Sequence, residues 1–550
     1  MPSPNSRQSW LPLVVLATGV SMVVIDATIV NVAVPAILAD LRLGATDVEW
    51  INSVYSLMFA ALLIPFGRMG DLHGRRRLFA LGVAVFLLAS VLAALSVNGP
   101  MLIAVRAVQG VGAAMAVPMT LAIINRIYTG RQRVIAFAVW GSIIGGMAAA
   151  GPLAGGWLVT EYGWRAAFWI NLPIAALLLL GSLRVPESRA GHAAGADLAG
   201  LVLAVTGTTG VVFALIEGQK YGWLTPRRTA DLFGLRFESV SPVPFAFGAG
   251  VVALAALVVL ERRRERAGRP VLVDLTLFEL PSFRYGSMAA VIVALGEFGM
   301  ILVLPLFLQS ALGYTAFRAG LVIAVLALGT FLAGGLVPAL SKRWSPRAIV
   351  RAGLGMEAVG AAGIGLSLTP GMGPWRLVPW LLLYGAGIGL ATAQLTGVLL
   401  ADVPARLSGG ASALQSTIRQ LGAALGVAVL GGVLVAGLGS AVERGLSGRP
   451  EQVRAGVARV VEESAGAAIP SIRDPAIHAA AVEGAAEATR RVALITALAL
   501  LAGVGATLLL PRTPASPDEP DEPDEPGESG ESGEPVAAAG PDTGGRDPKT

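Results

Sequence analysis

The chain of 550 residues contains no cysteine, and this absence excludes several kinds of chemistry. Disulfides, thiolate metal sites and cysteine nucleophiles are ruled out. Only three histidines occur, far apart in the sequence, at His73, His192 and His478. We therefore expect neither a metal site nor a bound cofactor.

Charge is also scarce, since Asp, Glu, Lys and Arg make up 14% of the residues while hydrophobic residues make up 54%. Glycine is abundant, with 69 residues, as is typical of helices in membranes. Residues 511–550 hold 11 of the 36 acidic residues, which leaves the remainder strongly basic. In a membrane protein such an excess reflects topology and contact with lipid headgroups. We expect lipid contact and no binding of nucleic acid.

Long apolar runs define the expected fold. A helix needs about 20 mostly apolar residues to cross the hydrocarbon core. Fourteen runs meet this length, which predicts an all-α integral membrane protein with both termini on one side. These runs lie near residues 11–35, 50–68, 78–97, 100–124, 134–159, 166–184, 198–217, 243–260, 285–309, 318–340, 347–368, 377–400, 409–437 and 490–510.

Basic residues in the connections predict the orientation. If both termini are cytoplasmic, the inner connections contain the arginine clusters at 75–77 and 262–264, whereas the short outer connections are poor in basic residues. The outer connection at 218–242, with four basic residues, is the exception. The bias still favours cytoplasmic termini, in a plasma membrane. The first run lacks a clear cleavage site, so we interpret it as a retained helix rather than a signal peptide.

An internal repeat of 271 residues suggests two related halves. This offset places Asp26 on Glu297, and residues 69–76 on residues 340–347. Such repeats build many transporter folds. The predicted divisions are a cytoplasmic N-terminus (1–10), a six-helix bundle (11–184), a linker with two inserted helices (185–284), a second six-helix bundle (285–510) containing an external loop (438–488), and a disordered acidic cytoplasmic tail (511–550).

A compact cluster of charge at residues 67–77 lies between the second and third runs. Its glycines allow a tight reversal, and its acid can pair with an arginine or face the N-terminus of a neighbouring helix. The residues concerned are Gly67, Asp71, Gly74, Arg75 and Arg76. Any short cytoplasmic connection can be rich in glycine and arginine. The spacing nevertheless resembles the loop between helices two and three of the major facilitator superfamily, and we expect a latch that breaks when the bundles rock.

Arg106 comes a few residues into the fourth run, followed by Gln109, Gly110 and Gly112. An arginine near a helix end can extend its guanidinium to the membrane surface. The spacing also resembles the fourth-helix signature of the same superfamily, which implies a part in proton handling.

The fifth run is rich in small residues and ends in Gly-Pro-x-x-Gly-Gly. Small residues let helices approach closely, and proline bends the helix. The positions are Gly145, Gly151, Pro152, Gly155 and Gly156. Ordinary small-residue packing would explain them too, but the pattern resembles the family's antiporter motif, which implies export.

Two further segments, residues 26–35 and 164–173, resemble signatures of the fourteen-span drug:proton antiporters (the DHA2 branch). Gln415 and Arg419 in the thirteenth run fit the same branch, and Asn31 belongs to the first segment.

Ionisable residues inside the runs are the candidates for proton coupling. A carboxylate in hydrocarbon costs a few kcal/mol, so it finds a partner, faces a cavity or is protonated. Asp26, Glu297 and Glu357 qualify by position, with Arg106 and Arg419 as possible partners. A structural role for Asp26 is an equal alternative, and Glu297 is the acid we expect to function.

The sequence therefore predicts a monomeric secondary exporter of small amphipathic compounds, driven by protons through alternating access. An exporter dedicated to one endogenous metabolite is the alternative. A membrane enzyme or receptor is a remote one, since no Walker A loop or His-Glu-x-x-His motif occurs.

Overall fold

A computed structural model of the chain describes residues 9–41, 45–189, 197–226, 230–232, 235–237, 239–404 and 407–509. The contacts divide the chain into one unit of residues Met1–Thr513 and a second of Pro514–Thr550. The acidic tail predicted to be disordered lies outside the described residues, as do residues 1–8.

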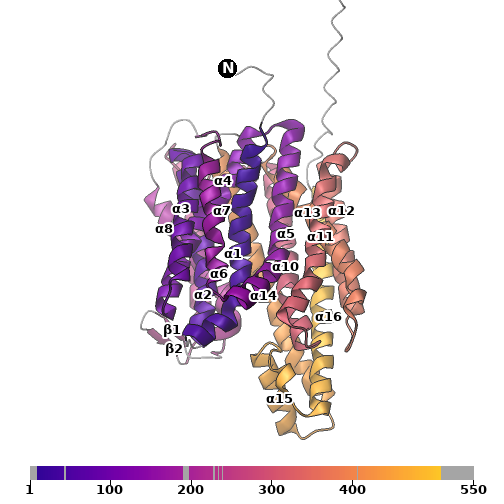
Figure 1. Cartoon of the computed structure of the whole chain (residues 1–550). Helices are drawn as coiled ribbons and strands as arrows, with labels where there is room; N and C mark the ends of the chain where they lie inside the picture. The colour runs from indigo at the N-terminus through magenta and orange to yellow at the C-terminus, as the bar shows by residue number, and fades with distance from the viewer. Residues whose placement is uncertain are drawn as a thin grey trace, which may run out of the picture. The chain divides into compact units, whose positions relative to one another are not determined.

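Long helices form the first half of the described chain, and they run side by side in Figure 1. In order they are α1 (Leu11–Leu41), α2 (Ala45–His73), α3 (Arg75–Ala94), α4 (Gly99–Ile127), α5 (Gly130–Tyr162), α6 (Ala166–Trp169) and α7 (Asn171–Ser182). We call the side where α1 begins the N-terminal side, and the other the opposite side.

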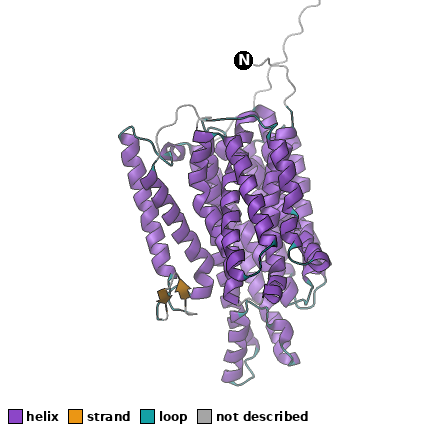
Figure 2. Ribbon diagram, turned by 60° about the vertical axis from the view of Figure 1, so that its left-hand side comes forward, coloured by secondary structure: helices purple, strands orange, loops and turns teal. Residues whose placement is uncertain are grey.

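A pair of inserted helices follows, α8 (Leu198–Tyr221) and α9 (Val243–Arg266), joined by a hairpin of β1 (Ala230–Leu232) and β2 (Leu235–Phe237). Ala230 pairs with Phe237 in this antiparallel hairpin. Figure 2 shows the two strands at the end of the helices that they connect. These strands are the departure, within the described residues, from the all-α fold that the sequence predicts.

The second half repeats the helical pattern. Its helices are α10 (Pro281–Ser310), α11 (Ala316–Leu340), α12 (Pro346–Ser367), α13 (Val378–Leu400), α14 (Ser408–Gly445), α15 (Glu451–Glu463) and α16 (Pro475–Ala506), with single 3-10 turns η1 (Leu275–Glu279), η2 (Pro374–Arg376), η4 (Ile469–Ser471) and η5 (Thr507–Leu509).

Twelve helices among the described residues are long and apolar enough to cross a membrane. The two further spans predicted from the sequence fall on α5, with 33 residues, and on residues 166–182, where the helix breaks at Ile170 into the short α6 and α7. The count of fourteen spans stays a prediction.

Polar side chains mark where several of these helices begin. Asn98 accepts a hydrogen bond from Met101 N at the start of α4, and Asp197 accepts one from Gly200 N at the start of α8. Ser345 caps α12 in the same way. These caps satisfy backbone donors that have no partner within the helix.

Buried apolar residues gather in two main clusters. The larger draws on α10 to α16, with Phe307 and Tyr384 inside it, and the second draws mainly on α1 to α5. The two halves meet where α5 packs on α11 and α13, and where α2 packs on α14. Glycine allows one close approach, since a Cβ at Gly141 would lie 2.8 Å from Ala393 Cα.

The inserted helix α8 contacts both halves, packing on α2 and on α14. The rings of Trp50 and Phe213 stack with centroids 6.3 Å apart. Gln219 Nε2 donates to Ala428 O at 2.6 Å, and a Cβ at Gly432 would lie 2.6 Å from the same nitrogen atom. Helix α8 is thus fixed to both sides of the junction.

The segment 438–488, predicted as an external loop with some helix, is mostly helical. Helix α14 continues to Gly445, α15 follows, and α16 begins at Pro475, with Asp474 as its cap. Figure 1 shows α15 at the end of the helical unit farthest from the N-terminus. The alanine-rich, charged composition suits these helices because alanine has the highest helix propensity.

Candidate functional site

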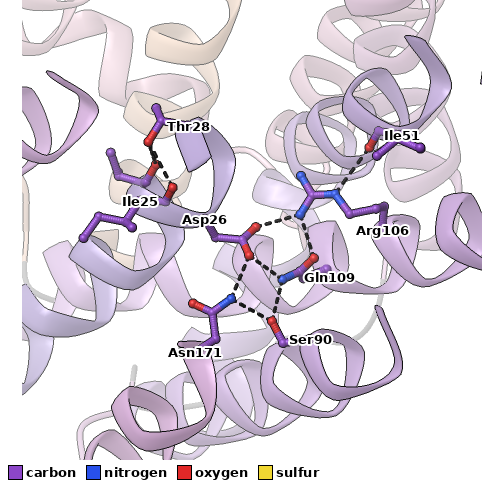
Figure 3. Close-up of polar contacts among 9 residues, drawn as sticks. Ile25, Asp26, Thr28, Ile51, Ser90, Arg106, Gln109 and Asn171 are labelled. Atoms are coloured by element: carbon purple, nitrogen blue, oxygen red, sulfur yellow. Dashed lines mark hydrogen bonds and ion pairs between the residues drawn. The ribbon is translucent and has the colours of Figure 1, made fainter. Parts of the chain in front are cut away.

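Asp26 lies at the centre of a polar cluster between α1, α3, α4 and α7 (Figure 3). Its Oδ2 pairs with Arg106 Nη1 at 2.6 Å, and its Oδ1 accepts from Gln109 Nε2 at 2.8 Å and from Asn171 Nδ2 at 2.7 Å. Ser90 Oγ accepts from both amide groups. Both oxygens of this fully buried carboxylate are therefore satisfied.

Arg106 is buried, with 1% of its surface exposed, so it does not extend to the membrane surface. Its Nε donates to Ile51 O at 3.3 Å, and its guanidinium lies 4.2 Å from the centre of the Tyr55 ring. The alternative of a surface-seeking arginine is thus wrong, because the side chain turns inward to the carboxylate on α1.

Three members of this cluster were not assigned a role from the sequence. Asn171 and Gln109 occur within the recognised segments, and Ser90 lies in no motif. A polar residue in an apolar run was the one signal that could have found them. Of Asn31 the structure describes the backbone within α1, and its side chain lies outside the described part.

A second buried acid, Glu297 on α10, pairs with Arg419 on α14. Glu297 Oε2 lies 2.8 Å from Arg419 Nη2, and the acid is fully buried while the arginine side chain is 15% exposed. Among the described residues, no group donates to Glu297 Oε1. This pair is therefore less fully satisfied than the one around Asp26.

Glu357, on α12, is fully buried near this pair. Neither of its carboxyl oxygens has a hydrogen-bond partner among the described residues, and the same is true of Tyr384 Oη. Glu357 lies within electrostatic reach of Glu297 and Arg419. Gln415 does not join them, since its Nε2 donates to Thr396 Oγ1 at 3.2 Å.

A small apolar cavity lies inside the second half of the chain. Tyr384 is the one polar side chain among those that line it, on helices α10 to α13. The lining residues are Met300, Ile301, Leu304, Pro305, Ile323, Leu326, Ile364, Leu381 and Tyr384.

Asp71 bridges the two halves on the N-terminal side. Its Oδ1 pairs with Arg75 Nη2 at 2.8 Å, and its Oδ2 accepts from Gly410 N at 2.9 Å, in the first turn of α14. A carboxylate is stabilised there by the free N–H groups and the dipole of the helix. Gly67 also contacts α14, since a Cβ at this position would lie 2.1 Å from Ala413 Cβ.

Glu187, after α7, completes this turn and was missed in the sequence. It accepts hydrogen bonds from the backbone N–H groups of Arg76 and Arg77 at the start of α3. Gly74 has φ +114°, and a Cβ there would lie 2.9 Å from the Glu187 carboxylate. An acid more than a hundred residues away gives no signal in the local pattern.

The glycines of α5 face different neighbours. A Cβ at Gly151 would lie 1.7 Å from Thr28 Oγ1 on α1, and one at Gly155 would lie 3.1 Å from Ile29 Cα. A Cβ at Gly156 would meet nothing within 4 Å. Pro152 is half-buried within the helix, and the environment of Gly145 lies outside the described part.

The repeated loop at residues 340–347 makes other contacts. Ser345 caps α12, and Arg347 Nε donates to Thr507 O at 2.9 Å. Lys342, which stands where the repeat places Asp71, is exposed.

The signature at 164–173 contacts α1 on the opposite side. Trp164 Nε1 and Arg165 Nη1 donate to Asp40 Oδ2 at 3.0 and 2.6 Å. These hydrogen bonds, Trp164 first, lower the pKa of Asp40 below its usual range.

Three features described above lie in segments that resemble the superfamily: the loop joined to α14 through Asp71, the buried Arg106 in α4, and the close contact of Gly151 in α5 with α1. A comparison with family models gives the same result. The Major Facilitator Superfamily model matches residues 16–427. The chain belongs to the major facilitator superfamily. Membership makes it one of a family of multi-pass membrane transporters.

Curated relatives include exporters. The multidrug efflux pump LfrA of Mycolicibacterium smegmatis is 34% identical over 506 residues, which cover 90% of this chain and 96% of that protein. The probable actinorhodin transporter of Streptomyces coelicolor is 34% identical over 451 residues, 80% of this chain and 74% of that protein.

Among solved structures, the human organic anion transporter MFSD10 (TETRAN) covers 90% of this chain and all of its own, with a TM-score of 0.55. Its sequence identity of 14% shows a shared fold alone.

Proposed function

We propose that this protein exports small amphipathic compounds, including drugs and antibiotics, in exchange for protons. Its relatives are named as a multidrug efflux pump and a probable actinorhodin transporter. The glycine and proline pattern of α5 supports export as well. The proposal includes fourteen spans, a monomer in the plasma membrane and cytoplasmic termini.

One observation carries the proton-coupling part of the proposal. Glu297 is fully buried in mid-helix, pairs with Arg419 through one oxygen, and has no partner for the other oxygen among the described residues. A buried carboxylate of this kind gains or loses its proton when a single contact changes. Asp26 differs, because Arg106, Gln109 and Asn171 hold both of its oxygens.

The mechanism we propose is alternating access. Protonation of Glu297 releases Arg419 on α14, and α14 is also the helix that Asp71 holds at its first turn. Loss of the proton on the cytoplasmic side restores the ion pair. Substrate and proton thus occupy the carrier in alternation, while the halves rock about a central cavity.

A drug-accumulation assay tests this proposal. Cells expressing the protein should accumulate less ethidium and puromycin than control cells, and an uncoupler should abolish the difference. The Glu297→Gln variant should lose the difference at an equal amount of protein in the membrane. Glu217→Gln, which alters a buried acid on α8 that pairs with Lys220, serves as the matched control.

The drug-pump proposal fails if neither expression nor the proton gradient changes the accumulation of any compound in a wide panel. An exporter dedicated to one metabolite is the second candidate, favoured by the similarity to the probable actinorhodin transporter. That candidate predicts transport of a single compound class, and the same panel separates the two.

A further inference from the structure

Glu357 is buried at the middle of α12, and its carboxyl group lacks a counterpart. None of its surface is exposed, and neither oxygen has a hydrogen-bond partner among the described residues. A lone buried carboxylate costs several kcal/mol relative to water. The neutral, protonated form is the one that this environment tolerates.

The charges in this region do not balance if Glu357 and Glu297 are both ionised. Glu297 and Arg419 form an ion pair within electrostatic reach of Glu357. On α13, Tyr384 is the ionisable group that faces it, and on α16 Arg490 is held at the far end of α12 by Leu368 O. One arginine therefore serves two carboxyl groups, and a single shared proton makes the cluster neutral.

Close helix packing brings Tyr384 beside Glu357. A Cβ at Gly387 of α13 would lie 2.6 Å from Glu357 Cγ, and a Cβ at Gly360 of α12 would lie 2.7 Å from Tyr384 N. Residues 384 and 387 are separated by one helical turn, as are residues 357 and 360. The tyrosine hydroxyl is buried and has no hydrogen-bond partner among the described residues.

The cavity lies on the side of this cluster away from the N-terminal side. Leu304 follows Glu297 by two turns on α10, and Ile364 follows Glu357 by two turns on α12, a distance of about 10 Å along each helix. Leu381 comes near the start of α13, which begins on the opposite side. Tyr384 is therefore the member of this cluster that borders the small apolar cavity.

We propose that Glu357 holds a proton beside the Tyr384 hydroxyl and passes it to Glu297. In this step the O–H bond of Glu357 breaks, an O–H bond forms on Glu297, and the ion pair with Arg419 opens. Glu357 is left as a carboxylate and takes its next proton from water that reaches the cluster when the halves rock. The inference rests on the proposed proton-driven export and adds a second carboxyl group to the path of the proton.

Reconstitution of the full chain in liposomes tests the route. With ethidium as substrate, Glu357→Gln should keep exchange of labelled for unlabelled ethidium and lose ethidium-driven proton movement. Tyr384→Phe, which removes one oxygen atom, should slow proton movement and shift its pH profile, with exchange unchanged. Glu217→Gln, on α8 and outside the cluster, should keep both exchange and proton movement when equal amounts of folded protein are compared.

Infrared spectroscopy supplies a readout that does not depend on transport. The unaltered protein should show a protonated-carboxyl band that Glu357→Gln removes and Tyr384→Phe shifts. If Glu357→Gln does not fold, the shift in Tyr384→Phe decides the matter. A band that is absent, or that does not respond to either change, overturns the inference.

The two proposals fail differently. Absence of proton movement in the unaltered protein overturns proton-driven export itself. Proton movement that is normal in the unaltered protein and equally normal in Glu357→Gln overturns the route alone.

Discussion

Buried charges dominate at the scale of single residues, and Asp26 is the clearest case. Asp26→Asn would leave Arg106 buried without its negative partner. Removing one member of a buried ion pair costs about 3–5 kcal/mol. We expect a marked fall in the thermal unfolding temperature in detergent, followed by tryptophan fluorescence.

Asp40→Asn is the matched control for this change. It is the same substitution on the same helix, and Asp40 also pairs with an arginine, but about half of its side chain is exposed. Exposed pairs contribute little because water screens them. Equal thermal unfolding temperatures for Asp26→Asn and the unaltered protein would contradict the structural role of Asp26.

Gly74 is a second residue whose identity the structure requires. Gly74→Ala places a Cβ against Glu187 at φ +114°, a backbone strain of roughly 1–3 kcal/mol besides the clash. We expect lower thermal stability than for Gly130→Ala, since Gly130 has φ +49° and open space around it. If the two variants melt alike, the contact with Glu187 has no importance.

At the scale of elements, α5 is the helix whose packing we can test most directly. Gly151→Ala would drive a methyl group into Thr28 Oγ1 and separate α5 from α1. Gly156→Ala, five residues further along, meets nothing within 4 Å. We expect ethidium efflux to be lost in Gly151→Ala and kept in Gly156→Ala, at equal amounts of each variant in the membrane.

Equal efflux in these two variants would show that the motif acts by composition and not by contact. Both variants keep Pro152 and therefore the bend in α5. Comparing them thus tests the close approach of α5 to α1 by itself.

The helices themselves were largely predictable, and some of their ends were not. Each apolar run that the sequence contains falls on a helix, because a run of that length and hydropathy has few other ways to satisfy its backbone. The break at Ile170 has a local cause, because Pro173 has no N–H to donate to Trp169 O. The extension of α14 to Gly445 gave no such signal, and there α14 packs against α15 and α16.

At the scale of the whole molecule, Asp71 ties the two halves together. Asp71→Asn removes the negative charge of the carboxylate. That carboxylate accepts a hydrogen bond from Gly410 N and forms an ion pair with Arg75. A hydrogen bond to a charged group contributes roughly 1.5–3 kcal/mol, and about 1.4 kcal/mol is a factor of ten. We expect the start of α14 to open about tenfold more often.

A chain without cysteine makes this opening easy to measure. Ser408, fully buried at the start of α14, can be replaced by cysteine and its rate of maleimide labelling followed. Ser9→Cys, at an exposed position, gives the rate for free access. A labelling rate at position 408 that Asp71→Asn leaves unchanged would rule out the latch.

The sequence by itself determined the membrane class, the family and the identity of the buried acids, because hydrophobic runs make every charge within them conspicuous. Only the tertiary structure decided which charge meets which. Both carboxyl oxygens of Asp26 have hydrogen-bond donors, whereas Glu297 has a partner for one oxygen. Glu357 has a partner for neither oxygen among the described residues. Hydrogen bonding depends on contacts between helices far apart in the chain, and no local pattern of residues encodes those contacts.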